Sequence, residues 1–173
     1  MTRVVISTIG KDRPGIVNAI AEIVNDLNLS IEDSRMTVLG GEFAVLMSVA
    51  GGTLPLQRLE TKLGKLAEKL DLAFLFRRTA MRDNVEGRIP YTVSVTAMDH
   101  PGIVHRVASF FSSQNINIYN LDTVTERAPH TGTPIFSLVM EVEVPPEIRI
   151  VELRDSFFYF CDDHDLDGEL RPS

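Results

Sequence analysis

The sequence repeats itself at a separation of 87 residues. GKDRPGIV at 10–17 lies over AMDHPGIV at 97–104, which matches Asp12 with Asp99 and all of Pro-Gly-Ile-Val. The same offset continues on both sides of this segment and pairs Ser7 with Ser94, Ala21 with Ala108, Asn28 with Asn115, and Ile31 with Ile118. Six extra residues in the second copy then bring Phe43 over Phe136 and Met47 over Met140. A repeat this long indicates a duplicated folding unit.

Each copy opens with a strand pattern that changes to a helix pattern. Residues 4–9 are apolar and β-branched, and residues 91–96 alternate apolar with polar side chains, as strands do. Apolar residues then recur at helical spacing over 16–27 and 103–111. Pro14 and Pro101 are predicted to lie where these helices begin, because the first turn needs no amide hydrogen bond there.

The remainder of each copy predicts two strands, a helix and a last strand. The strands are expected at 30–39 and 42–51, joined by Gly40-Gly41, and at 117–127 and 134–144. Helices are expected after Pro55 and after Pro145-Pro146, and closing strands over 72–76 and 166–173, the latter with few apolar residues. The order predicts an α+β fold of two tandem ferredoxin-like (βαββαβ) modules, with antiparallel sheets and helices on one face. We expect modules at 1–80 and 89–173 and a linker at 81–88.

The charge balance argues against direct binding to nucleic acid. Seventeen Lys and Arg against 24 Asp and Glu give a net charge of −7, which opposes attraction to phosphate. No apolar run is long enough to cross a bilayer, and no secretory signal is visible, so we expect a cytoplasmic protein. Cys161 is the only cysteine, and its acidic neighbours Asp162, Asp163 and Asp165 disfavour the thiolate, so it is interpreted as a core residue.

Neither a metal site nor a catalytic site is predicted. The four histidines lack the paired spacing of zinc ligands. The acidic segment 163–168 matches only the first half of an EF-hand loop, whose last ligand would fall beyond residue 173. Because no known catalytic motif is present either, we expect neither enzymatic activity nor a cofactor.

The motif D-x-P-G-I-V at a helix start, found twice within ferredoxin-like units, resembles the ACT family. IEDSR at 31–35 and LGGEF at 39–43 further resemble the glycine cleavage repressor family, whose members have two ACT modules. The resemblance implies a transcriptional co-regulator that senses a small amino acid, glycine first, and acts through a protein partner, a DNA-binding transcriptional activator.

The loop before each first helix is the candidate amino-acid site. Gly15 and Ile16, like Gly102 and Ile103, are predicted in a first helical turn, where free amides attract a carboxylate. Asp12 and Asp99 would accept the ammonium group of the ligand. By analogy with amino-acid-binding ACT domains, the polar residues at the start of the second strand would complete the sites; these are Ser30 and Asn117.

Structural roles are the alternative for the aspartates, the glycines and the second-strand residues of these sites. Asp12 and Asp99 would then cap their helices, Gly15 and Gly102 would permit close packing on the sheet, and Ser30 and Asn117 would be turn residues. Two other functions also remain open at this point. They are a regulatory subunit of an amino-acid metabolic enzyme and a structural module that forms homo-oligomers.

Overall fold

The computed structural model describes residues 2–80 and 87–173, and each of these two stretches forms a compact unit of its own. The predicted linker at 81–88 lies outside the described residues except for Gly87 and Arg88, which directly precede the second unit's first strand. Among the described residues, no helix has both the length and the apolar composition needed to cross a bilayer.

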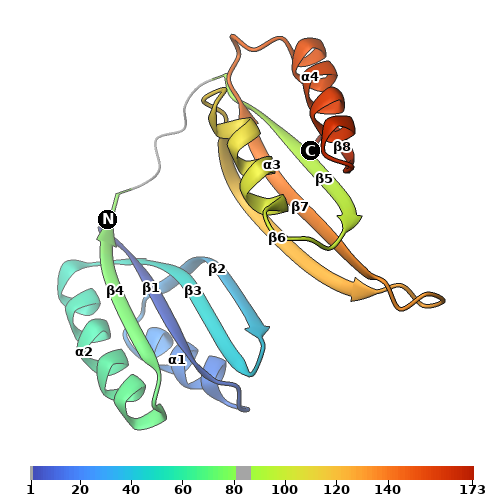
Figure 1. Ribbon diagram of the computed structural model, residues 1–173. Helices are drawn as coiled ribbons and strands as arrows, with labels where there is room; N and C mark the ends of the chain where they lie inside the picture. The colour runs from blue at the N-terminus through green and yellow to red at the C-terminus, as the bar shows by residue number, and fades with distance from the viewer. Residues whose placement is uncertain (1, 81–86) are drawn as a thin grey trace. The chain divides into compact units, whose positions relative to one another are not determined.

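The two units contain the same elements in the same order (Figure 1). The first consists of β1 (Thr2–Lys11), α1 (Ile16–Asp26), β2 (Ser30–Leu39), β3 (Glu42–Gly51), α2 (Thr53–Leu70) and β4 (Ala73–Thr79). The second consists of β5 (Ile89–Met98), α3 (Ile103–Ser112), β6 (Asn117–Arg127), β7 (Pro134–Val144), α4 (Ile150–Asp163) and β8 (Asp167–Pro172). The strand orders are β2-β3-β1-β4 and β6-β7-β5-β8, and every pair is antiparallel.

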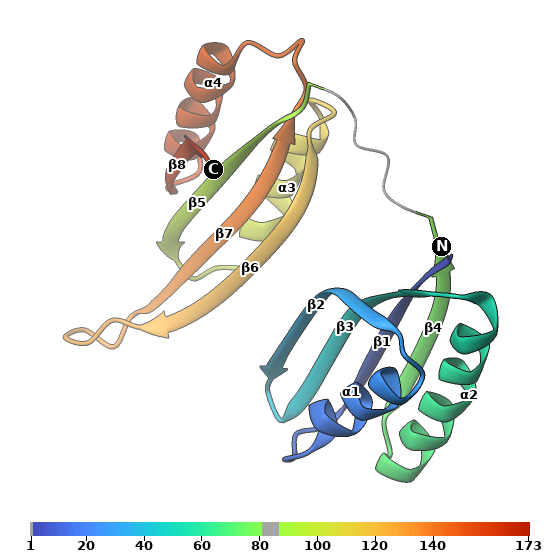
Figure 2. The same cartoon turned by 180° about the vertical axis from the view of Figure 1, so that it is seen from behind.

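Both helices of each unit cover one face of its sheet, as the views from opposite sides show (Figure 2). The cause is the alternation of the central strands, since Val4 and Ile6 in β1 are fully buried while Val5 and Ser7 are only partly covered. On α1, Ile16, Ile20 and Val24 are buried at helical spacing. The predicted α+β ferredoxin-like architecture is therefore confirmed.

The predicted positions of three prolines relative to the helices α1, α2 and α3 need correction. Pro14 and Pro101 lie two residues before the first helical residues, Ile16 and Ile103, in the turn that leads into each helix. Pro55, by contrast, is the third residue of α2 and not a residue before it. Pro55 is accommodated because first-turn amides have no helical acceptor, and Pro14 and Pro101 are accommodated because they lie outside the helix.

The duplication also preserves irregular backbone. Asn28 and Asn115, matched in the repeat, both have left-handed conformations, with φ of 53° and 58°. They follow α1 and α3, where a left-handed residue commonly ends a helix, and asparagine tolerates it better than most residues. Each second strand then carries an irregularity at the same place, after Ile31 in β2 and after Ile118 in β6.

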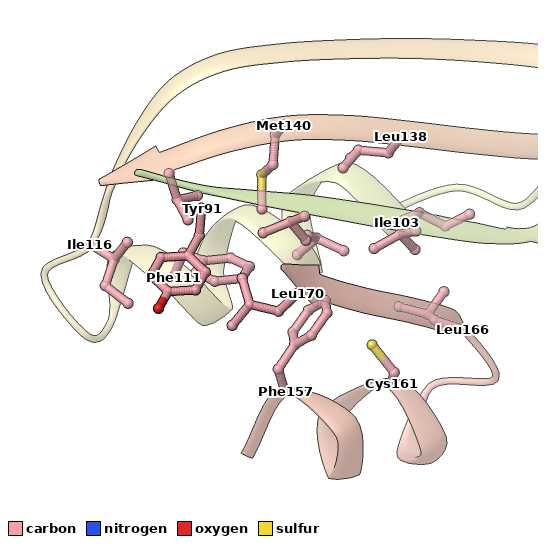
Figure 3. Close-up of a cluster of buried hydrophobic side chains, with 14 of the residues drawn as sticks. Tyr91, Ile103, Phe111, Ile116, Leu138, Met140, Phe157, Cys161, Leu166 and Leu170 are labelled. Carbon is pink, nitrogen blue, oxygen red and sulfur yellow. The ribbon is translucent and has the colours of Figure 1, made fainter. Parts of the chain in front are cut away.

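The second unit has an aromatic core (Figure 3). Phe157 of α4 packs against Phe110 and Phe111 of α3, with ring centroids 5.4 Å apart in both pairs. Cys161 is buried one turn further along α4, beside Gly168 of β8. A Cβ atom on Gly168 would lie 2.3 Å from the Cys161 sulfur, so the glycine leaves room for the thiol.

Burial raises the pKa of the Cys161 thiol to about 11, with a smaller contribution from the charge of Asp167. The sequence predicted that the thiolate of Cys161 would be disfavoured, and the raised pKa agrees with that direction. The cause differs, because burial contributes most and the acidic neighbour is Asp167, not Asp162, Asp163 or Asp165.

We expect Cys161 to react slowly with a thiol reagent at pH 8, because a rise from the ordinary value of 9.0 to about 11 lowers the thiolate population roughly 100-fold. Denaturant should restore ordinary reactivity. The raised pKa also favours the protonated folded state, so its contribution to stability is present below about pH 9 and lost as the pH rises towards 11. Labelling of the native protein as rapid as that of the denatured protein would contradict this assignment.

Candidate functional site

The loop between β1 and α1 is tied to the turn between β2 and β3. The amide of Asp12 donates a hydrogen bond to the carbonyl of Gly41, with an N–O distance of 3.1 Å. In the second unit the amide of Asp99 donates to the carbonyl of Pro134 at 3.0 Å. Both candidate loops are therefore held at the end of the sheet where β1 or β5 finishes.

Gly15 sets the backbone at the entry to α1. It is the N-cap residue, with φ of 99° and ψ of −10°, and its carbonyl accepts the first helical hydrogen bond from the amide of Ala19 at 2.9 Å. No side chain caps the helix. The amides at the start of α1 thus have no helical acceptor and lie at the positive end of the helix dipole.

The residues that carry these amides line an open hollow of about 320 Å³ in the first unit, a size within the range of small-molecule pockets. The residues that line it come from the loop, the first turn of α1 and the start of β3; they are Asp12, Arg13, Pro14, Gly15, Ile16, Val17 and Phe43. Ile16 is buried and fixes the first turn to the core, while Asp12 and Arg13 are exposed. The hollow combines a carboxylate, a guanidinium group and free amide donors.

The second unit repeats the backbone of this loop. Gly102 is the N-cap of α3 with φ of 96°, and its carbonyl accepts from the amide of Arg106 at 3.0 Å. Ile103 is buried and Asp99 is exposed, as are their counterparts in the first unit. The side chains differ, because His100 stands where the first unit has Arg13.

Two of the structural alternatives are wrong. Asp12 and Asp99 do not cap their helices, since the N-cap residues are Gly15 and Gly102 and neither helix has a side-chain cap. The prediction that these glycines belong to the first helical turn is corrected in the same way. Close packing does not require Gly15 either, because a Cβ atom there would meet nothing within 4 Å. Its positive φ is the physical requirement for glycine.

Ser30 and Asn117 do not lie beside the candidate loop of their own module, so their part in a binding site stays a prediction. β1 and β2 are both antiparallel to β3, so they run parallel to each other, and the start of β2 lies at the end of the sheet opposite Asp12. Ser30 pairs with Ala50, the residue that also pairs with Arg3 of β1. Nine strand residues, roughly 30 Å, separate that row from the loop.

Asn117 has the same placement in the second unit, where it pairs with Glu143 of β7. Both residues begin exposed strands, so the turn interpretation is wrong as well. A single module therefore brings together Asp12, Gly15 and Ile16, or Asp99, Gly102 and Ile103, without the second-strand residue.

Sequence reasoning missed Phe43, which lines the hollow from β3. Its match with Phe136 in the repeat was the available signal, together with its place in LGGEF, because Gly41 of that motif holds the amide of Asp12. Arg13 was not assigned to the site from the sequence either, although it lines the same hollow. Its charge adds to the attraction of an anion at the helix start.

The IEDSR segment has a different role, away from the loop. Glu32 forms a two-point ion pair with Arg3 of β1, one of whose contacts, Nη2 to Oε1, measures 2.8 Å. The side-chain hydrogen bond to Arg3 lowers the pKa of Glu32. Asp33 accepts a hydrogen bond from Arg35 at 2.7 Å. The first pair links β1 to the edge strand β2, the second lies within β2, and none of these four residues lines the hollow.

The part of the chain that the structure describes contains no group of three or more His, Cys, Asp or Glu side chains that could hold a metal ion. Asp163 ends α4, Asp165 lies in the following turn, and Asp167 begins β8, so the acidic tail is part of the helix-to-strand connection.

Comparison with known proteins supports a regulatory class. Two ACT-domain families match residues 2–77 and 91–149. The chain is 28% identical over 166 residues to the glycine cleavage system transcriptional repressor of Escherichia coli (strain K12), covering 96% of this chain and 87% of that protein.

Two solved structures are similar to this chain over nearly its whole length. One is provisionally assigned as a glycine cleavage system transcriptional repressor, with a TM-score of 0.74 and 27% identity over 98% of this chain and 96% of that one. The other is an unknown protein from Galdieria sulphuraria, with a TM-score of 0.79 and 26% identity over 99% and 98% of the two chains. Both similarities extend across the two modules.

Proposed function

The chain belongs to the ACT-domain family, and on that premise we propose that it is an amino-acid-sensing transcriptional co-regulator that acts through a protein partner. The observation that carries the proposal is the loop at the start of α1, where Asp12, Arg13 and the uncapped first turn of the helix line one hollow. Similarity to a transcriptional repressor over 96% of the chain supports the regulatory part.

A small zwitterion fits the chemistry of this loop. Its carboxylate would accept hydrogen bonds from amides at the start of α1, where the dipole favours negative charge. Arg13 would add a positive charge on the same side, and the Asp12 carboxylate would accept from the ammonium group. Glycine is the first ligand to test, because the repressor it resembles is named for glycine cleavage.

Modest affinity is expected. Glycine has about five heavy atoms, and a ceiling of about 1.5 kcal/mol per atom limits its binding to about 7.5 kcal/mol, a dissociation constant of several micromolar at best. Titration calorimetry with the twenty amino acids should detect at least one ligand below about 10 mM. If none binds in that range, the sensor function is wrong and a purely structural module takes its place.

Asp12→Ala should weaken amino-acid binding about tenfold or more, because a hydrogen bond to a charged group contributes about 1.5–3 kcal/mol. The matched control is Glu22→Ala, which removes an exposed carboxylate from α1 outside the hollow. Asp99→Ala tests the second module in the same assay. Equal affinities of Asp12→Ala and the unmodified protein would remove Asp12 from the site.

Regulation through a partner implies that the isolated protein does not bind DNA tightly, in keeping with its net charge of −7. We expect no sequence-specific complex below about 1 μM in mobility-shift assays near physiological salt. A submicromolar complex with a defined site would overturn action through a partner. Capture from a native lysate should return a DNA-binding transcriptional activator, whereas a metabolic enzyme would identify a regulatory subunit instead.

A further inference from the structure

The outer face of α4 carries three large apolar side chains that the core does not use. Val151, Phe158 and Tyr159 are 62%, 64% and 66% exposed. Their separations of seven and eight residues place them on one side of the helix, away from the buried residues Leu153, Phe157 and Cys161. The Phe158 and Tyr159 rings lie edge to face, with centroids 5.9 Å apart.

The duplicated helix α2 shows that the fold does not need apolar residues there. The buried positions Leu59, Leu63 and Ala67 of α2 correspond to Leu153, Phe157 and Cys161 of α4. The same alignment gives the residues of α2 at the three exposed positions, which are Gln57, Gly64 and Lys65 in place of Val151, Phe158 and Tyr159. The apolar side chains are thus particular to the second module.

Acidic side chains outnumber basic ones around these residues. The exposed carboxylates are Glu152, Asp155, Asp162 and Asp163. Two arginines lie near them: Arg149 pairs with Glu152, and Arg154 donates a hydrogen bond to the carbonyl of Leu170. The negative charge of the whole chain also comes from the second module. Residues 89–173 contain 13 Asp and Glu and five Lys and Arg, whereas residues 1–80 contain nine Asp and Glu and ten Lys and Arg. The net charge of −7 therefore resides in the second module.

We propose that this α4 face, defined by Val151, Phe158, Tyr159 and the four carboxylates, docks a positively charged surface of another protein. The inference rests on the proposed function, because it assigns the surface through which the partner is reached. Exposed aromatic side chains supply the central contacts that dominate interface affinity. The surrounding carboxylates favour a basic partner, raise its association rate and repel nucleic acid.

A defined probe tests the chemistry of the face directly. The probe is a Lys/Leu amphipathic helical peptide about as long as α4, and its control is the Glu/Leu peptide of the same pattern. Titrated into the full chain and followed by amide NMR, the Lys/Leu peptide should shift resonances concentrated in α4, and the Glu/Leu peptide should shift none. Amide shifts spread evenly over all the acidic residues of the second module would overturn the assignment of this face.

The partner itself is tested with three substitutions taken largely from α2, Val151→Gln, Phe158→Gln and Tyr159→Lys, combined in one chain. All three positions are exposed, so the variant should fold normally. Its affinity for the purified protein captured from the native lysate should fall at least about tenfold. Leu54→Gln on α2 is the control, because Leu54 is 68% exposed and its loss should leave the affinity unchanged.

The outcomes separate this inference from the proposed function. Equal affinity of the triple variant and the unmodified chain overturns the docking face and leaves action through a partner intact. Capture of no partner overturns both. A second copy is the competing occupant, because α2 carries a basic row of Arg58, Lys62, Lys65 and Lys69. If the triple variant abolishes self-association in sedimentation without changing capture of the partner, the face belongs to the homo-oligomer and the inference is wrong.

Discussion

Replacing Phe157 with alanine is expected to lower the free energy of unfolding of the second module by about 3–5 kcal/mol. The ring is buried at the centre of the aromatic core, in contact with Phe110, Phe111 and Phe160. Its removal forfeits the transfer free energy of the ring and leaves a cavity between α3, α4 and β8. Urea unfolding followed by the near-ultraviolet signal of tyrosine measures the loss.

Tyrosine reports on the second module alone, because Tyr91, Tyr119 and Tyr159 all belong to it and the chain has no tryptophan. The adjacent residue provides the control. Phe158→Ala removes the same ring from the exposed face of α4 and should change stability by about 0.5 kcal/mol or less. Similar losses for the two substitutions would mean that α4 packs on the sheet through a different face.

The fold could be predicted because the duplication and the hydrophobic period agree. The expected strands at 30–39, 42–51, 117–127 and 134–144 coincide with β2, β3, β6 and β7. Apolar and polar residues alternate along the strands, and apolar residues recur every three or four positions along the helices, so the pattern identifies the type of each element. The second copy repeats both patterns. The predicted helix starts were less accurate, because a proline can lie either before a helix or within its first turn and so does not mark the first residue.

The candidate site could be predicted only in part, because its loop is continuous in sequence but its other contributors are not. Asp12, Gly15 and Ile16 follow one another along the chain, and the structure places all three at the hollow. Phe43 reaches the hollow through strand pairing with Gly10, which no local pattern reveals. The resemblance supplied Ser30 without its position in the fold: because β1 and β2 run parallel, the start of β2 lies at the far end of the sheet from Asp12.

Net charge was informative as an average and misleading as a description of the surface. The value of −7 predicts weak attraction to phosphate, but it conceals a nearly neutral first module and a strongly acidic second one. Helical spacing in the sequence already places Phe157 on the buried face of α4 with Leu153. The packing of the helix adds that the two next residues, Phe158 and Tyr159, are exposed.

Gly15→Val is expected to lower the free energy of unfolding of the first module by about 1–3 kcal/mol and to abolish amino-acid binding at its loop. The cost is conformational, because φ is 99° at Gly15 and a Cβ atom there would meet nothing within 4 Å. Relaxation of the strain would turn the amides of the first turn away from the hollow. Amide exchange of β1 measures the stability, and calorimetry measures the binding.

Two further substitutions distinguish backbone strain from simple bulk at this loop. Gly41 also has open space around it but no positive φ, so Gly41→Val should cost about 0.5 kcal/mol or less. Gly15→Asn should recover only part of the loss. Asparagine and aspartate occupy left-handed positions elsewhere in this chain at φ between 51° and 58°, well short of the 99° that Gly15 adopts. If Gly15→Val and Gly41→Val prove equally stable and bind equally well, the positive φ is not what shapes the candidate site.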